Sequence, residues 1–122
     1  MPISGLDHYT IGTADLDRAV AFYEKALGLE NGPRPDFDFP GAWLYADGRP
    51  IVHLFENPTL RDRRTGPLDH ISFNADDMDE ALKRLDRLGI GYTRREVPGG
   101  RMLQVFLHDH DGIRIELNFK VG

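Results

Sequence analysis

The sequence predicts an α+β fold of two similar βαβββ modules, in which a mixed, curved sheet lines a cavity. Two observations lead to this prediction: the chain contains an internal repeat, and each copy shows an alternating segment, a helical pattern and further alternating segments. A chain of 122 residues that is 40% hydrophobic has the usual size of one domain. We therefore expect a single domain over 1–122, with module one at 1–58, a linker at 57–67 and module two at 67–122.

The repeat lies at the start of each module. The segment LDHYTIGTADLDRAVAFYE at 6–24 aligns with LDHISFNADDMDEALKRLD at 68–86, and six of the nineteen positions are identical. The alignment matches His8 with His70. Chance is a poor explanation for this similarity, so we interpret the two halves as copies of one unit.

Module one reads in order as a strand, a helix and further strands. Residues 5–11 alternate in polarity and predict a short buried strand with His8 in its middle. Apolar residues at helical spacing over 16–27 predict a helix. Its candidate caps are Thr13 or Asp15 at the N-cap and Gly28 at the C′ position. A loop or edge strand is expected at 31–41, and strands at 41–46 and 50–56 joined by an Asp-Gly turn at 46–48.

Module two repeats this order. The alternating run after His70 predicts its first strand, and apolar residues at helical spacing over 78–88 predict its helix. The candidate caps are Asn74 or Asp77 at the N-cap and Gly89 at the C′ position. Strands are expected at 91–97, 102–108 and 113–119, with a hairpin turn at 109–112.

Composition and charge exclude several classes of function. The 15 basic and 20 acidic residues give a net charge of −5 without a run of five like charges, so we expect no nucleic acid partner and no polybasic membrane anchor. The chain has no cysteine, which leaves only nitrogen and oxygen ligands for a metal. No apolar stretch approaches the ~18 residues of a membrane span, and the N-terminus does not resemble a signal peptide. We expect a cytoplasmic protein without membrane contact.

Ligand-type side chains fall at matching positions of the two modules. His8 is matched with His70 in the first strands, and His53 is matched with Glu116 in the last strands at an offset of 63. A pseudo-two-fold axis would bring these four side chains together on the polar faces of the strands. Three imidazoles and one carboxylate suit zinc, nickel, cobalt, manganese or ferrous iron. A lone strand histidine is more often an ordinary surface or core residue, but the two matched pairs together favour a metal-lined cavity.

Four stretches of the chain resemble the vicinal oxygen chelate superfamily, which includes glyoxalase I, extradiol dioxygenases and bleomycin resistance proteins. They are LDHYTIGTADLDRAVAFYEKALGL, GAWLYADGRPIVHLFE, LDHISF and DGIRIELNF, and the match runs nearly end to end. The resemblance implies metal ligands at His8, His70 and Glu116, with the fourth at His53, where glyoxalase I usually has glutamate. It also implies a small-molecule substrate and a homodimer whose metal sites each combine one module of each chain.

The number of ligands separates the chemistries that this resemblance allows. If all four side chains bind an octahedral ion, two positions remain for a substrate with neighbouring oxygens, which suits a glyoxalase-type lyase or isomerase acting through an enediolate. This is the interpretation that we prefer, with His53 and Glu116 as the catalytic residues. If His53 does not bind the ion, three positions remain, which suits an Fe(II) extradiol dioxygenase. A binding protein without catalysis, as in bleomycin resistance, is the third alternative.

The remaining candidates concern the substrate pocket. Trp43 and Tyr45 alternate on a predicted strand and are candidates for the pocket floor, although a tryptophan is as often plain core. Arg101 and Gln104 are candidates for binding a charged group of the substrate, although an arginine is more often solvated.

Overall fold

The computed structural model describes residues 6–59, 68, 70–96 and 102–120. The chain divides into two compact units, residues 1–61 and 62–122. Each unit contains one helix and one four-stranded mixed sheet, so the predicted α+β fold of two βαβββ modules is confirmed.

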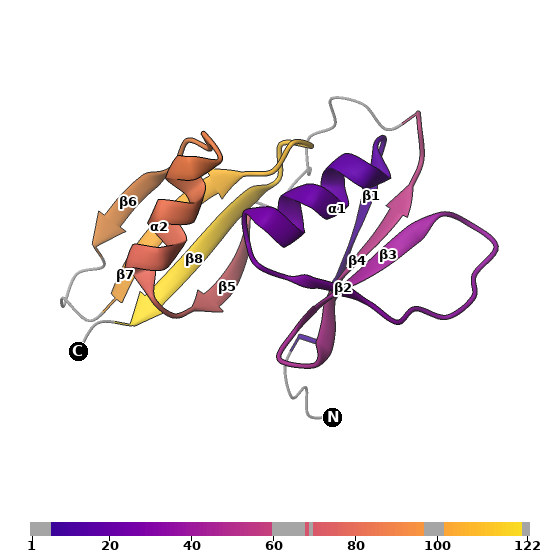
Figure 1. Ribbon diagram of the computed structural model, residues 1–122, viewed down its shortest axis with the longest axis horizontal. Helices are drawn as coiled ribbons and strands as arrows, with labels where there is room; N and C mark the ends of the chain where they lie inside the picture. The colour runs from indigo at the N-terminus through magenta and orange to yellow at the C-terminus, as the bar shows by residue number, and fades with distance from the viewer. Residues whose placement is uncertain (1–5, 60–67, 69, 97–101, 121–122) are drawn as a thin grey trace. The chain divides into compact units, whose positions relative to one another are not determined.

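Unit 1 forms a sheet in which the first strand lies at one edge and pairs with the last. The strand order is β1-β4-β3-β2, with β1 parallel to β4 and the other pairs antiparallel (Figure 1). Its elements are β1 (Tyr9–Thr13), α1 (Leu16–Lys25), β2 (Glu30–Gly32), β3 (Gly41–Ala46) and β4 (Arg49–Glu56).

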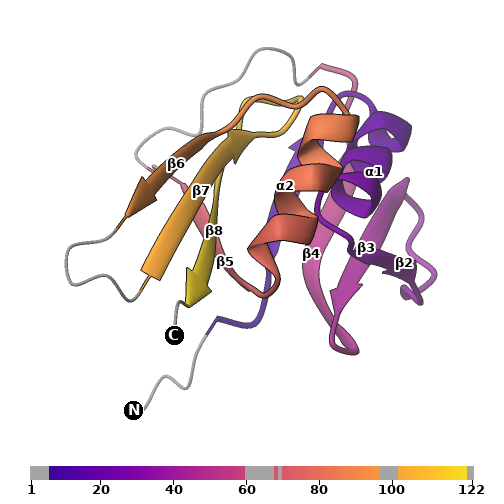
Figure 2. The ribbon, with the colours of Figure 1, turned by 60° about the vertical axis from the view of Figure 1, so that its left-hand side comes forward.

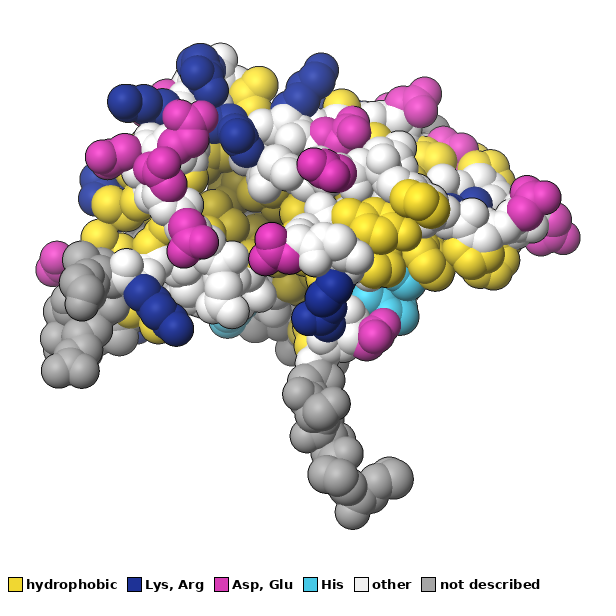
Figure 3. All heavy atoms as spheres, turned by 60° about the horizontal axis from the view of Figure 1, so that its bottom comes forward, with side chains coloured by type: hydrophobic (Ala, Val, Ile, Leu, Met, Phe, Trp, Pro, Cys, Tyr) yellow, Lys and Arg dark blue, Asp and Glu magenta, His cyan; other side chains and the backbone are white. Residues whose placement is uncertain are grey.

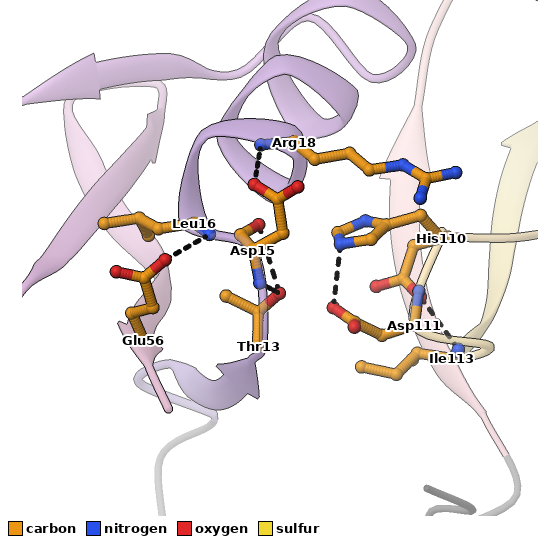
Figure 4. Close-up of polar contacts among 9 residues, drawn as sticks. Thr13, Asp15, Leu16, Arg18, Glu56, His110, Asp111 and Ile113 are labelled. Carbon is orange, nitrogen blue, oxygen red and sulfur yellow. Dashed lines mark hydrogen bonds and ion pairs between the residues drawn. The ribbon is translucent and has the colours of Figure 1, made fainter. Parts of the chain in front are cut away.

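Helix α1 begins at an acidic cap and covers one face of this sheet. Of the two candidate N-caps, Asp15 accepts a hydrogen bond from the Arg18 amide, and Glu56 accepts one from the Leu16 amide at the same helix end (Figure 4). Ala19 and Tyr23 of α1 are fully buried. The helix packs on β3 and β4, whose buried side chains are Ala42, Leu44, Val52 and Leu54. The opposite face of the sheet therefore carries Trp43 and His53, both half-buried.

The hairpin between β3 and β4 has the predicted Asp-Gly turn. Asp47 and Gly48 have φ angles of 50° and 74°, which is the left-handed conformation that a two-residue hairpin turn requires. Beyond the turn the register shifts between Tyr45 and Leu44, and as a result Trp43 lies directly opposite His53.

Unit 2 repeats this architecture. Its sheet has the order β5-β8-β7-β6, with β5 parallel to β8 (Figure 2). Its elements are β5 (Ile71–Ala75), α2 (Met78–Arg87), β6 (Thr93–Glu96), β7 (Met102–His108) and β8 (Arg114–Lys120). Asp77 is the N-cap of α2, and Gly89 lies at the predicted C′ position with φ 70°. In the turn before β8, buried Asp109 accepts hydrogen bonds from the amides of Asp111 and Ile113.

Three local predictions differ from the structure. His8 was predicted to lie in the middle of a buried strand, but it lies one residue before β1 and its side chain is 35% exposed. The pairing of β1 with β4 begins only at Tyr9, so the polarity alternation extends beyond the paired residues. The apolar pattern of the second helix was predicted to run through residue 88, but Leu88 is the exposed C-cap residue. Gly28 lies two residues after the C-cap of α1, one later than predicted.

The segment 31–41 was predicted to be a loop or an edge strand. The structure divides it, since β2 ends at Gly32 as the sheet edge and a loop continues to Pro40. No helix within the described residues is long and apolar enough to cross a membrane.

Candidate metal centre

Unit 1 brings His8 and His53 into direct contact. Their ring centroids lie 3.7 Å apart with an angle of 13° between the planes, and Trp43 stacks on the other side of His53 at 4.0 Å and 12°. On the face that Figure 3 draws, histidine side chains (cyan) lie beside hydrophobic ones (yellow). His53 is thus held between two aromatic rings, which fixes the plane of its imidazole.

Hydrogen bonds give the two histidines opposite tautomers. Nδ1 of His8 lies 2.6 Å from the Asp7 carboxylate, so in the neutral ring Nδ1 carries the hydrogen and Nε2 the lone pair. Nε2 of His53 lies 3.1 Å from the carbonyl oxygen of Pro50, which can only accept, so in His53 the hydrogen is on Nε2 and the lone pair on Nδ1. A carboxylate on the outer nitrogen of a histidine is the usual support of a metal ligand.

The stacking allows only one of the two rings to bind a given metal ion, and the Asp7 contact favours His8 as that ring. A metal ion lies in the plane of the imidazole that binds it, at about 2.1 Å from the nitrogen. Two nearly parallel rings with centroids 3.7 Å apart cannot both have the same ion in their planes. In this arrangement His8, whose Nδ1 contacts the Asp7 carboxylate, has the Nε2 lone pair suited to a metal. His53 packs against the face of the His8 ring.

The charge state of His53 follows from the same contacts. Burial lowers the pKa of the His53 ring below its ordinary value, and the neighbouring His8 lowers it further. The Pro50 carbonyl and the Asp7 carboxylate oppose this shift without reversing it. His53 is therefore neutral at pH 7, with an unprotonated Nδ1.

Unit 2 holds the Glu116 carboxylate in a network of neutral donors. Oε2 accepts hydrogen bonds from the Ser72 hydroxyl and the Asn118 amide, both at 2.6 Å, and Oε1 accepts one from the Gln104 amide at 3.2 Å. Asn118 also donates to the Ser72 oxygen, which links the donors to each other. Glu116 is only 8% exposed, so these bonds replace the water that a buried carboxylate would lose.

The environment of Glu116 keeps it ionised. Burial acts to raise the pKa of this carboxyl, but the hydrogen bonds from Ser72 and Asn118 and the charges of His70 and Arg114 together leave the pKa lowered. Nε2 of His70 lies 3.6 Å from Oε1. Two atoms that bind one ion at about 2.1 Å lie about 3.0 to 3.4 Å apart. The pair His70 and Glu116 therefore fits a divalent cation with a small closing movement.

The predicted ligands thus occur as two pairs, His8 with His53 and His70 with Glu116. Across the described residues, no group of three or more His, Asp or Glu side chains gathers around one point. Among the pocket candidates, Trp43 stacks on His53 and Gln104 bonds to Glu116, whereas Tyr45 covers Gly32 and its hydroxyl donates to the Pro33 carbonyl. Arg101 lies outside the described residues.

Sequence reasoning missed the residues that support the predicted ligands. Asp7, Ser72 and Asn118 were not selected, although the strand pattern contained the signal. Ser72 is paired with Glu116 in the register of β5 and β8, and Asn118 follows Glu116 by two residues on the same strand face.

Comparison with known proteins agrees with this architecture. A family model described as Glyoxalase/Bleomycin resistance protein/Dioxygenase superfamily matches residues 5–117. The chain belongs to this superfamily. It is 36% identical to "Glyoxylase I 4" of Arabidopsis thaliana over 94% of this chain and 70% of that protein. It is 29% identical to "Lactoylglutathione lyase" of Salmonella typhimurium over 90% of this chain and 88% of that protein.

A solved structure gives the same result for the fold. The glyoxylase/bleomycin resistance protein/dioxygenase domain from Frankia sp. EAN1pec has a TM-score of 0.80 to this chain, with 25% sequence identity. The similarity covers 98% of this chain and all of that one. The superfamily recognised from the histidine and glutamate pattern is thereby confirmed.

Proposed function

We propose that this protein is a divalent-metal-dependent lyase or isomerase of the glyoxalase type, acting on a small substrate with two neighbouring oxygen atoms. The observation that carries the proposal is the state of His53, a neutral ring held between Trp43 and His8 with its lone pair on Nδ1. The similarity to the glyoxylase and lactoylglutathione lyase relatives supports it.

We assign the ion to His8, His70 and Glu116, through Nε2 of His8 and Oε1 of Glu116. The carboxylate of Asp7 orients His8, and the donors on Oε2 of Glu116 leave Oε1 as its less occupied oxygen. Zinc, nickel, cobalt, manganese or ferrous iron suit these nitrogen and oxygen ligands. When bound, the ion supplies Lewis acidity that lowers the energy of negative charge developing on the substrate oxygens.

His53 is proposed as the base. Its neutral Nδ1 takes a proton from a substrate carbon next to a carbonyl and returns it to the neighbouring carbon. The hydrogen bond from Nε2 to the Pro50 carbonyl and the two stacked rings hold this ring in one orientation, so the proton is accepted at a fixed place. Glu116, which is ionised and held in place by the two donors on Oε2, is better suited to hold the ion than to move a proton.

A second function, Fe(II) extradiol ring cleavage, is favoured by one observation. With His53 outside the assigned ligands, the set is two histidines and one carboxylate, the arrangement of many non-haem iron oxygenases. The ligand count therefore allows this function, and the similarity to the glyoxylase and lactoylglutathione lyase relatives is the reason to prefer the lyase or isomerase. The same His53 then serves as a base toward a catechol hydroxyl.

Loading the purified protein with single metals separates these functions. We expect cobalt- or nickel-dependent turnover of the hemithioacetal of methylglyoxal and glutathione, and no dioxygen uptake with catechols after anaerobic iron loading. Dioxygen uptake without hemithioacetal turnover would favour the dioxygenase instead.

The variant His53→Gln tests the assignment of the base. We expect it to retain the metal and to lose about 10²- to 10⁴-fold in kcat. His8→Gln, as the matched variant, should lose the metal. Equal loss of metal from both variants would contradict the assignment of His53 as a base that does not bind the ion.

A further inference from the structure

A row of aromatic rings leads away from His53 in unit 1. Trp43 stacks on His53, Phe37 lies 6.5 Å from Trp43 between ring centroids, and Phe39 stacks on Phe37 at 5.1 Å. Phe37 and Phe39 are 44% and 45% exposed, among the most exposed large hydrophobic side chains of the described residues. The row thus connects an apolar surface to the candidate metal ligands.

The loop that carries Phe37 and Phe39 is held in place at several points. The Tyr45 hydroxyl donates to the Pro33 carbonyl at 2.5 Å, and the Glu56 amide donates to the Pro40 carbonyl at 3.0 Å. Three prolines between residues 33 and 40 further restrict the backbone. The two exposed rings are therefore positioned before any ligand arrives, which lowers the entropic cost of binding.

Arg34, which belongs to the same loop, contacts both of these phenylalanines. Its guanidinium lies 4.9 Å from the ring centroids of both Phe37 and Phe39, and Nη2 donates to the Phe39 carbonyl at 3.0 Å. A cation on the face of an aromatic ring stabilises that ring's orientation. Arg34 is thus committed to the loop, and the rings are the part of the loop offered to a ligand.

We propose that Phe37, Phe39 and Trp43 form a subsite for an aryl group of the substrate. The subsite rests on the proposed function, because the neighbouring oxygens of the same substrate would lie at the metal next to His8. Stacked rings are the surface that a planar aromatic group prefers, and aliphatic residues would serve a purely aliphatic substrate as well. The subsite selects aryl-bearing over methyl-bearing substrates.

Hydroxamates test the subsite on the full-length protein loaded with cobalt. Acetohydroxamate, benzohydroxamate and 3-phenylpropanohydroxamate chelate through the same two neighbouring oxygens and differ only in the attached group. The visible absorption of cobalt reports chelation, calorimetry gives Kd, and Trp43, the single tryptophan of the chain, reports the aryl group by fluorescence. We expect the tighter aryl hydroxamate to bind about 10-fold better than acetohydroxamate.

The affinity ratio is the Kd of acetohydroxamate divided by the Kd of the tighter aryl hydroxamate. The Phe37→Ala/Phe39→Ala variant should bring this ratio close to one. Phe37→Leu/Phe39→Leu keeps the apolar bulk of the loop and should lower the ratio too, which guards against a folding defect. Leu88→Ala removes an equally exposed side chain from α2's C-cap and should keep the ratio.

Several outcomes would overturn the subsite. One is a wild-type ratio near one, and another is a ratio that both double variants preserve. A third is conversion of a dimeric protein to monomers by the double substitution, since the rings would then belong to a subunit contact. If no hydroxamate changes the cobalt absorption, the proposed function fails, and the subsite is then decided by whether the aryl hydroxamates alone quench Trp43.

Discussion

Glu116 shows how neutral neighbours decide the role of a carboxylate. Ser72 and Asn118 donate to Oε2 and, together with the charges of His70 and Arg114, hold the group ionised. Hydrogen bonds of this kind orient a metal ligand, and their loss typically costs 10- to 100-fold in metal affinity, so we expect about that loss for Ser72→Ala. Competition with a chromophoric chelator measures the effect.

The conservative variant Ser72→Thr keeps the hydroxyl and should restore most of the metal affinity. If Ser72→Ala binds metal as tightly as the wild type, the network does not position Glu116.

The pKa of His53 provides a prediction for the metal-free protein. Burial and the neighbouring His8 both lower it, so His8→Gln should raise the pKa of His53. Asp7 acts in the opposite direction, so Asp7→Asn should lower that pKa further. NMR titration of the imidazole resonances measures both, and shifts in the same direction for the two variants would refute this account.

The same shift has a consequence for stability. Because the folded pKa of His53 lies below 6.5, the unfolded chain binds more protons between the two values. Protonation of His53 in the unfolded chain therefore reduces the free energy of unfolding as pH falls below 6.5. The reduction reaches its full size once the pH lies below the pKa that His53 has in the folded protein. Urea unfolding of metal-free wild type and His53→Gln should show a smaller loss between pH 7 and pH 5 in the variant.

At the scale of elements, Gly41 is the first residue of β3 and follows the loop that carries Phe37 and Phe39. A Cβ at this position would lie 2.5 Å from the Leu54 carbonyl oxygen and 2.7 Å from Arg34 Nη2. Backbone at that distance cannot give way without moving β4, so we expect Gly41→Ala to lower the free energy of unfolding by on the order of 2 kcal/mol.

Gly91→Ala is the matched control, since a Cβ there meets nothing within 4 Å. Urea unfolding should show little change for Gly91→Ala. Equal stability of the two variants would mean that β3 and β4 adjust freely around residue 41.

The elements also show where local sequence patterns are sufficient. The Asp-Gly hairpin and the two aspartate N-caps follow from local chemistry, so they could be predicted. The start of β1 at Tyr9 depends on where β4 begins to pair, which no local pattern encodes. The stack of Trp43 on His53 likewise needs the cross-strand register, and the stacking of Phe37 needs the loop conformation.

At the scale of the whole molecule, duplication explains why the ligand types could be predicted and their supports could not. The repeat matched His8 with His70 and His53 with Glu116 because each module keeps its own alternation. The supports differ between the copies: one uses a carboxylate and stacked rings, and the other uses neutral donors on Glu116. Unit 1 thus holds one of the three proposed ligands, His8, and unit 2 holds the other two, His70 and Glu116.

We propose a homodimer in which each metal site combines unit 1 of one chain with unit 2 of its partner. Mixing two inactive variants tests this arrangement. His8→Ala impairs unit 1 and Glu116→Ala impairs unit 2, so each homodimer should lack both sites. In a mixed dimer, the unaltered unit 1 of one chain meets the unaltered unit 2 of the other, and one of the two sites is intact.

Refolding the two variants together should therefore restore metal binding, at up to one ion per mixed dimer, together with a matching share of the turnover. Sites formed within one chain would give no restoration, because every chain then carries one substitution in its own site. The double variant His8→Ala/Glu116→Ala refolded with wild type is the control. If the sites are shared between chains, its mixed dimers lose both sites. If each site forms within one chain, its mixed dimers lose only one. Shared sites therefore require that mixing the two single variants raises metal binding and that mixing the double variant with wild type lowers it.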